Sequence, residues 1–335
     1  MVQPSERFRV VITNKVFPAV LASFGDDFEL VSNPSTEPWD KDEWSQHLHS
    51  ADAVIAFMPD RLGEDELALC PRLKLISCAL KGYDNFDLHA CERRGIAVCI
   101  VEDLLTVPTA ELAVGLLIAV SRNLLKGDAS IRSGQFHSWR PILYGSGVQG
   151  ATIGLMGMGA VGQAIAARLK GFECSINYHD QRRLSEDSER ALGVALVARE
   201  ELFARSDFVI LALPLTAETT HCIDYDALAQ MKPGAYLINP ARGSLVDEAA
   251  VANALASNHL AGYAADVFEF EDWARRDRPQ EIVSRLQTMT DRTVFTPHLG
   301  SAVASVRLAI EFQAARNVRD FFAGKLPRGR VTGKR

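Results

Sequence analysis

Several features that would assign a function quickly are missing from this sequence. It has no excess of basic residues, because 36 lysines and arginines against 42 aspartates and glutamates give a formal net charge of −6. Without a basic surface, nucleic acid and anionic membranes are poor partners. The longest apolar run, residues 107–120, contains Glu111 and is too short to span a bilayer. Residues 1–10 lack the apolar stretch of a signal peptide, so we expect a soluble cytoplasmic protein.

Cysteine is used sparingly and in no metal-binding pattern. The six cysteines form no C-x-x-C pair and have no histidine partner at zinc spacing. Four of them lie in or beside apolar runs, where a thiol acts as a small hydrophobic group. We therefore expect reduced cysteines, no disulfide and no metal site. The six are Cys70, Cys78, Cys91, Cys99, Cys174 and Cys222.

What is present is an α/β pattern repeated along the chain. A length of 335 residues with a hydrophobic share of 47% suits two ordinary domains. Strand-like runs alternate with amphipathic segments, which indicates parallel sheets. In the first part we expect helices at 40–49 and 84–94, the second ending at Gly95. The expected strands there are 8–13, 28–31, 53–58, 73–80 and 97–101.

A second series of strands begins at residue 151 and has the number expected of a dinucleotide-binding fold. The final helix, expected at 303–323, should pack back against the first part and make that domain discontinuous. The basic tail at 328–335 is expected to be frayed. The expected strands of the second series are 152–156, 175–179, 208–213, 235–239, 262–267 and 293–296.

The most specific motif is a G-x-G-x-x-G sequence at residues 157–162, placed between an expected strand and an expected helix. Gly157 would permit the tight turn, Gly159 would let the backbone approach a pyrophosphate, and Gly162 would allow close helix–strand packing. Ala160 and Val161 lie in the same motif, just before the helix expected at 163–170, whose N-terminus offers free N–H groups to phosphates. The motif predicts a bound dinucleotide.

The next expected strand is followed by Asp180, 18 positions after Gly162. A carboxylate there can bind the adenosine ribose hydroxyls and repel a 2′-phosphate, which favours NAD. Arg182 and Arg183 follow directly and could accommodate a 2′-phosphate, so some use of NADP is also expected.

Three residue types needed for hydride transfer follow strands of the second series. Arg242 follows one strand and can hold an oxyanion through its guanidinium fork. His298 follows another, between Pro297 and Leu299-Gly300, and can exchange a proton near neutral pH. A carboxylate from the acidic run at 269–272 would orient the histidine ring. Residue patterns leave Glu269, Glu271 and Asp272 as alternatives for that carboxylate.

Together these blocks resemble the D-isomer-specific 2-hydroxyacid dehydrogenase family. The resemblance implies two doubly wound domains: a Rossmann NAD-binding domain at 105–301 with a dimerisation segment at 105–150, and a discontinuous flavodoxin-like substrate domain at 1–104 and 302–335. It selects Glu271 as the catalytic carboxylate, beside Arg242 and His298. The matching blocks lie at 81–85, 108–111, 157–162, 239–243, 266–268 and 297–298.

Some blocks depart from the general family pattern and resemble its phosphite dehydrogenases. Lys81 stands where hydroxyacid enzymes more often carry a small or apolar residue, and Asp272-Trp273 follows Glu271 where they usually carry proline. Phosphite is a small dianion, which two cations, Lys81 and Arg242, would suit. The resemblance therefore implies NAD-dependent oxidation of phosphite to phosphate.

The alternatives are an ordinary 2-hydroxyacid dehydrogenase of the glyoxylate or hydroxypyruvate reductase type and, more remotely, an NAD-sensing corepressor-like binding protein. The resemblance also implies a homodimer without a metal, in which His298 either acts as the base or only orients the substrate. The further substrate residues it implies are Met58, Gly82, Leu105, Ser301, Arg307, Trp139 and Tyr144, and the further cofactor residues are Lys81, Thr109, Leu213, Pro214, Pro240, Ala241 and Asp266.

Overall fold

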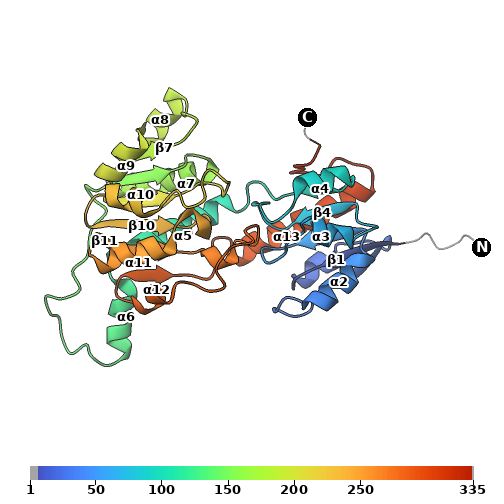
Figure 1. Ribbon diagram of the computed structural model, residues 1–335, viewed down its shortest axis with the longest axis horizontal. Coiled ribbons are helices and arrows are strands. Elements are labelled where there is room, and N and C mark those ends of the chain that lie inside the picture. The colour runs from blue at the N-terminus through green and yellow to red at the C-terminus, as the bar shows by residue number, and fades with distance from the viewer. Residues whose placement is uncertain (1–6, 334–335) are drawn as a thin grey trace, which may run out of the picture. The chain divides into compact units, whose positions relative to one another are not determined.

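The computed structural model describes residues 7–333, so part of the segment examined for a signal peptide lies outside it. The chain divides into two compact units (Figure 1). Unit 1 comprises Met1–Leu105, Trp273–Arg276 and Ala302–Arg335, and unit 2 comprises Thr106–Asp272 and Asp277–Ser301. Leu105 and the segment Trp273–Arg276 thus belong to unit 1, whereas the sequence analysis assigned them to the NAD-binding domain.

Unit 1 is built on a five-stranded parallel sheet of order β2-β1-β3-β4-β5. This is the strand order of flavodoxin-like folds, the fold that the family resemblance implies for this domain. The central strands are fully buried, because both faces of the sheet are covered. The strands are β1 (Phe8–Ile12), β2 (Phe28–Ser32), β3 (Ala53–Ala56), β4 (Leu75–Cys78) and β5 (Ala97–Cys99).

The helices of unit 1 include the final helix of the chain. Ser77 of β4 donates its hydroxyl proton to the carbonyl of Ala314 at 2.9 Å, and Ala314 is fully buried. The predicted return of this helix to the first unit is therefore confirmed. The helices are α1 (Pro18–Leu21), α2 (Lys41–His49), α3 (Glu64–Ala68), α4 (Leu88–Arg93) and α13 (Ala304–Phe322).

Two local predictions in unit 1 were wrong. Helix α4 begins at Leu88 rather than at Asp84, because the Asp87 side chain accepts a hydrogen bond from the N–H of Ala90 and caps the helix. The tail is also not frayed within the described residues. The N–H of Val331 donates to the carbonyl of Val98 at 2.8 Å, so the tail pairs with β5. Lys334 and Arg335 lie outside the described residues.

The cysteines lie where their apolar surroundings predict. Cys70, Cys78, Cys91 and Cys99 are buried in unit 1, and all six cysteines have free thiols. Burial raises the pKa of Cys70 to about 11 and that of Cys99 to about 12. These thiols therefore stay protonated and unreactive at neutral pH.

Unit 2 contains a seven-stranded parallel sheet of order β12-β11-β10-β9-β6-β7-β8. Counted within the unit, the order 3-2-1-4-5-6 is that of dinucleotide-binding folds, with one strand added. The sequence predicted six strands and missed β8, which is short, lies at the sheet edge and has two exposed residues. The strands are β6 (Thr152–Met156), β7 (Ser175–His179), β8 (Val194–Leu196), β9 (Phe208–Leu211), β10 (Ala235–Asn239), β11 (Leu260–Ala265) and β12 (Thr293–Phe295).

Helices cover both faces of this sheet. Helices α5 and α7 pack in one core, with Leu117 and Ile165 fully buried, and α9 to α12 contribute to the other. In Figure 1, α6 and the green segment after it extend away from the sheet of unit 2. The helices are α5 (Thr106–Ser121), α6 (Leu124–Arg132), α7 (Ala160–Leu169), α8 (Glu186–Leu192), α9 (Arg199–Arg205), α10 (Tyr225–Gln230), α11 (Glu248–Ala256) and α12 (Ser284–Thr288).

Within residues 7–333 no single helix is long and apolar enough to cross a membrane, although α5 and α6, bent by 63°, pass that test as a pair. The same residues contain no group of three or more His, Cys, Asp or Glu side chains placed to hold a metal ion.

Candidate active site

The glycine loop joins β6 to α7 as the motif predicts. Gly157 has φ = +96°, and a Cβ there would lie 2.5 Å from the carbonyl oxygen of Ala212. A Cβ on Gly162 would lie 2.3 Å from the carbonyl oxygen of Gly157, so this close approach requires glycine. A Cβ on Gly159, the residue before α7, would meet nothing within 4 Å. The loop thus leaves open space at a helix N-terminus, which fits a dinucleotide pyrophosphate.

Asp180 lies directly after β7, beside this loop. Its Oδ2 accepts a hydrogen bond from the N–H of Met158 at 2.7 Å, and its Oδ1 accepts one from the N–H of Arg182 at 2.9 Å. Arg183 is engaged by the carboxylate of Glu189 at 2.9 Å. Ribose binding by Asp180 stays a prediction, and Arg183, which could help to accommodate a 2′-phosphate, is paired with Glu189.

A histidine–carboxylate pair follows β11 and β12. His298 Nδ1 lies 2.9 Å from Glu271 Oε2, and both side chains are largely but not fully buried. The other oxygen of Glu271, Oε1, accepts a hydrogen bond from the N–H of Phe268 at 2.8 Å. Both oxygens of the carboxylate are therefore fixed, and His298 is oriented through Nδ1.

The turn that presents His298 is strained and strongly held. His298 has φ = +55°, in the left-handed region that side chains other than glycine rarely adopt. Asp266 accepts hydrogen bonds from the N–H groups of Leu299 and Gly300 at 2.6 and 2.8 Å. Burial raises the pKa of Asp266, while hydrogen bonds from Thr296, Leu299 and Gly300 oppose that rise.

Arg242 lies just after β10 in a turn closed by Asn239. The Asn239 side-chain amide donates to the carbonyl of Arg242 at 2.8 Å, and its oxygen accepts from the N–H of Ala241 at 3.1 Å. The Arg242 guanidinium donates to the carbonyl of Ala241 at 2.9 Å. The next residue, Gly243, has no room for a side chain, since its Cβ would lie 1.9 Å from the backbone carbon of Phe268.

The three acids that the residue patterns left as alternatives have separate partners. Glu271, which the family resemblance implies as the catalytic carboxylate, contacts the His298 ring. Glu269 Oε2 lies 2.7 Å from Nε2 of His221, and Asp272 accepts a hydrogen bond from the N–H of Ser244 at 2.5 Å. Sequence inspection gave no signal for His221 or Ser244.

The remaining residues proposed for the site divide between the two units. Leu213 lies beside Gly157, 3.0 Å from the position of an added Cβ, and Thr109 donates its hydroxyl proton to the carbonyl of Gly300 at 3.3 Å. Trp139 and Tyr144 are 77% and 75% exposed in this chain. Unit 1 contains Met58, Lys81, Gly82, Leu105 and Arg307, and unit 2 contains Thr109, Trp139, Tyr144, Pro214, Pro240, Ala241 and Ser301.

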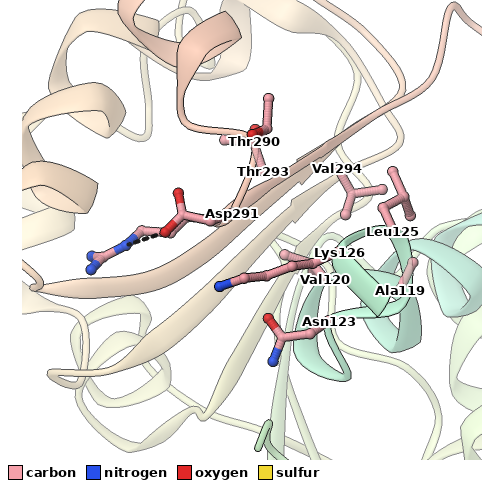
Figure 2. Close-up of a pocket in the computed structure, with 10 residues that line it drawn as sticks. Ala119, Val120, Asn123, Leu125, Lys126, Thr290, Asp291, Thr293 and Val294 are labelled. Carbon is pink, nitrogen blue, oxygen red and sulfur yellow. Dashed lines mark ion pairs between the residues drawn. The ribbon is translucent and has the colours of Figure 1, made fainter. Parts of the chain in front are cut away.

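Two hollows in unit 2 lie at the amino ends of its strands. One is lined by residues at the end of α5 and start of α6, including Lys126, and by residues 290–294 at the start of β12 (Figure 2). His298 follows the carboxyl end of β12. Because ligands of open α/β sheets bind outside the carboxyl ends of the strands, this hollow is not the candidate active site.

Comparisons with known proteins agree with this geometry. Residues 114–300 match the family model of the D-isomer specific 2-hydroxyacid dehydrogenase NAD binding domain. A glyoxylate reductase of Pyrococcus furiosus is 36% identical over 324 residues, which cover 95% of this chain and 94% of the relative.

Solved structures show the same likeness. The TT0316 protein of Thermus thermophilus matches with a TM-score of 0.87 and 32% identity, covering 97% of this chain and 100% of that protein. An NADPH-dependent glyoxylate/hydroxypyruvate reductase of Sinorhizobium meliloti, solved with NADP and malonate, matches with a TM-score of 0.82 and 28% identity, covering 97% of both chains. This chain carries an NAD-binding domain and belongs to the D-isomer-specific 2-hydroxyacid dehydrogenase family.

Proposed function

We propose that this chain catalyses hydride transfer between NAD and a small anionic substrate, with Arg242, Glu271 and His298 as its catalytic residues. One observation carries the proposal. Strands β10, β11 and β12 are adjacent and parallel, and each is followed by one of the three residues. Their carboxyl ends meet at one edge of the sheet, where ligands of this fold class bind.

The chemistry of each residue follows from its contacts. When bound, the oxidised cofactor NAD would accept the hydride, and the reduced cofactor NADH would supply it. Arg242 would bind the oxyanion of the substrate through its guanidinium group. His298 would give or take the proton at Nε2, because the carboxylate of Glu271 engages Nδ1 and fixes the ring orientation. The glycine loop would bind the pyrophosphate through the N-terminus of α7.

The first candidate substrate is a 2-oxo acid such as glyoxylate, with the corresponding 2-hydroxy acid as the product. It is supported by the relatives named glyoxylate reductase, two of which are 36% identical to this chain over 324 residues. A carboxylate beside a carbonyl suits one arginine, since the guanidinium fork binds a carboxylate bidentately.

The second candidate, oxidation of phosphite, is favoured by residues at three positions, as the sequence resemblance implies. Lys81 is the residue that would supply a second cation suited to a dianion. Asp272-Trp273 follows Glu271 where a hydroxyacid enzyme usually has proline, and the Asp272 carboxylate accepts a hydrogen bond from the N–H of Ser244 that a proline side chain could not accept. None of the relatives named above is a phosphite enzyme, so this candidate rests on the sequence resemblance.

One assay separates the candidates. In one set of reactions the purified chain is mixed with NADH and either glyoxylate or hydroxypyruvate, and the loss of NADH absorbance is followed. In the other set it is mixed with NAD and either phosphite, D-lactate or glycerate, and the gain of NADH absorbance is followed. Faster turnover of the organic acids supports the first candidate, whereas faster turnover of phosphite supports the second. If phosphite is the preferred substrate, Lys81→Ala should raise the KM for phosphite strongly. If glyoxylate is preferred, Lys81→Ala should change the KM for glyoxylate little.

We further propose that the protein works in the cytoplasm as a homodimer. The segment after α5 exposes large apolar side chains of a kind that a partner subunit would cover, among them Leu124, Phe136 and Trp139 at 51%, 55% and 77% exposed.

A further inference from the structure

We infer that Asp272 is a positioning residue for Arg242 and acts through the backbone of Ser244. The inference rests on the proposed role of Arg242 in binding an anionic substrate. Asp272 is only 2% exposed, and its Oδ2 accepts a hydrogen bond from the N–H of Ser244 at 2.5 Å. Ser244 is two residues after Arg242.

The burial of the Asp272 carboxylate has to be compensated by hydrogen bonds. A buried carboxylate is costly unless hydrogen bonds compensate for lost hydration. Here the N–H of Ser244 supplies such a hydrogen bond to the Asp272 carboxylate. It fixes the 3-10 turn Gly243–Leu245, which begins directly after Arg242.

The same turn contacts the segment of Glu271 on its other side. A Cβ on Gly243 would lie 2.3 Å from the backbone nitrogen of Glu269, so the two backbones touch there. The carbonyl of Ser244 accepts a hydrogen bond from the N–H of His221 at 2.7 Å. His221 in turn contacts Glu269 through its ring.

These contacts link the two loops that carry the candidate catalytic residues. Glu271 contacts His298, and the neighbouring residue, Asp272, holds the turn of Arg242. Asn239 closes that turn from the strand side, so Arg242 is held at both ends. A small displacement of a substrate-binding group can reduce catalysis by about a hundredfold. The hydrogen bond between Ser244 and Asp272 would therefore affect substrate binding by Arg242 as well as the stability of the fold.

The test compares Asp272→Ala, Asp272→Asn and a matched control, Asp247→Ala. Asp247 follows the same turn and caps α11 by accepting a hydrogen bond from the N–H of Ala250 at 3.0 Å. Oxalate is titrated by calorimetry into each protein saturated with NADH, and NADH affinity and Tm are measured separately. Steady-state KM and kcat are measured with whichever substrate the unmodified protein turns over.

We expect Asp272→Ala to weaken oxalate binding and raise substrate KM by about tenfold to a hundredfold, with NADH affinity changed less than about twofold. Asp272→Asn should stay near the unmodified protein, because the amide oxygen can still accept from Ser244. Asp247→Ala should lower Tm without changing oxalate affinity. In an Arg242→Ala background, Asp272→Ala should have no further effect on oxalate.

Unchanged oxalate affinity in folded Asp272→Ala would overturn the inference, as would an equal loss in Asp247→Ala or an additive loss in the Arg242→Ala background. If Asp272→Ala does not fold, Asp272→Leu, which keeps the buried volume, is measured against the same expectations. An unmodified protein that neither binds oxalate nor turns over any of the substrates would refute the proposed function and this inference with it. If the unmodified protein binds oxalate and the Asp272 variants bind it with the same affinity, the inference is refuted and the proposed function is not.

Discussion

The carboxylate of Asp266 holds the turn that presents His298. It accepts hydrogen bonds from Thr296, Leu299 and Gly300, and the N–H of His298 donates to the Asp266 carbonyl at 2.9 Å. His298 keeps a left-handed backbone conformation under these constraints. The family resemblance implies that Asp266 is a cofactor residue, which stays a prediction, and the structure shows that its carboxylate holds this turn.

Glu271→Gln should lower kcat by about tenfold or more while leaving NAD affinity unchanged. The amide can still accept the hydrogen bond from Phe268 but cannot balance a charged imidazole. General acid–base catalysis contributes about a hundredfold to ten-thousandfold, so His298→Ala should lose more. The pH profile of kcat/KM should shift in Glu271→Gln. A profile that coincides with that of the unmodified protein would show that the pair has no role in proton transfer.

Asp180→Asn should raise kcat/KM for NADP relative to NAD. The substitution removes the charge that repels a 2′-phosphate but keeps an oxygen that can accept from Met158. Arg183 is occupied by Glu189, so Arg182 is the cation expected to engage the phosphate. Adding Arg182→Ala should therefore reverse the gain. If the NADP to NAD ratio stays constant in Asp180→Asn, the ribose contact lies elsewhere.

Asp60 should make the stability of unit 1 dependent on pH. Burial raises the pKa of Asp60 from 3.8 to about 6, although hydrogen bonds from Thr13 and Phe57 oppose the rise. The folded state thus binds this proton more tightly than the unfolded state, and stability falls as pH rises between these two values. The free energy of unfolding of Asp60→Asn should not fall over this range. Relative to the unmodified protein it should therefore rise by roughly 1–3 kcal/mol between about pH 4 and pH 7. Urea unfolding measures the difference, and parallel stability curves would contradict it.

The homodimer proposal gives a prediction for the exposed segment after α5. Light scattering at micromolar concentration should give a molecular mass twice that of one chain. The double variant Ile131→Ser, Phe136→Ser should give a mass closer to that of the monomer. Both side chains are more than half exposed in the single chain, at 55% and 56%. A comparable substitution at Leu326, which is 78% exposed in unit 1, serves as the control. A monomeric unmodified protein would refute the proposal.

Sequence periodicity predicted the buried strands well because each is a short, continuous apolar run. It failed for β8, whose burial pattern has only one buried residue, and for the tail at 328–333, whose pairing with β5 depends on distant backbone groups. Arg242 and His298 were identifiable because their chemistry coincides with a position directly after a strand, whereas residue patterns left three acids as alternatives after β11. The partners Ser244 and His221 were not, because turn geometry brings them to the acidic run.

The most direct test of the proposed function is NADH-linked turnover of glyoxylate and of phosphite by the unmodified protein, with Arg242→Ala and Lys81→Ala measured beside it. We predict turnover of at least one of the two substrates, and loss of nearly all of it in Arg242→Ala with NAD affinity retained. If glyoxylate is preferred, Lys81→Ala should change its KM little. If phosphite is preferred, Lys81→Ala should raise its KM strongly. Turnover of neither substrate, or full activity in Arg242→Ala, would contradict the proposal that Arg242 holds the anion during hydride transfer.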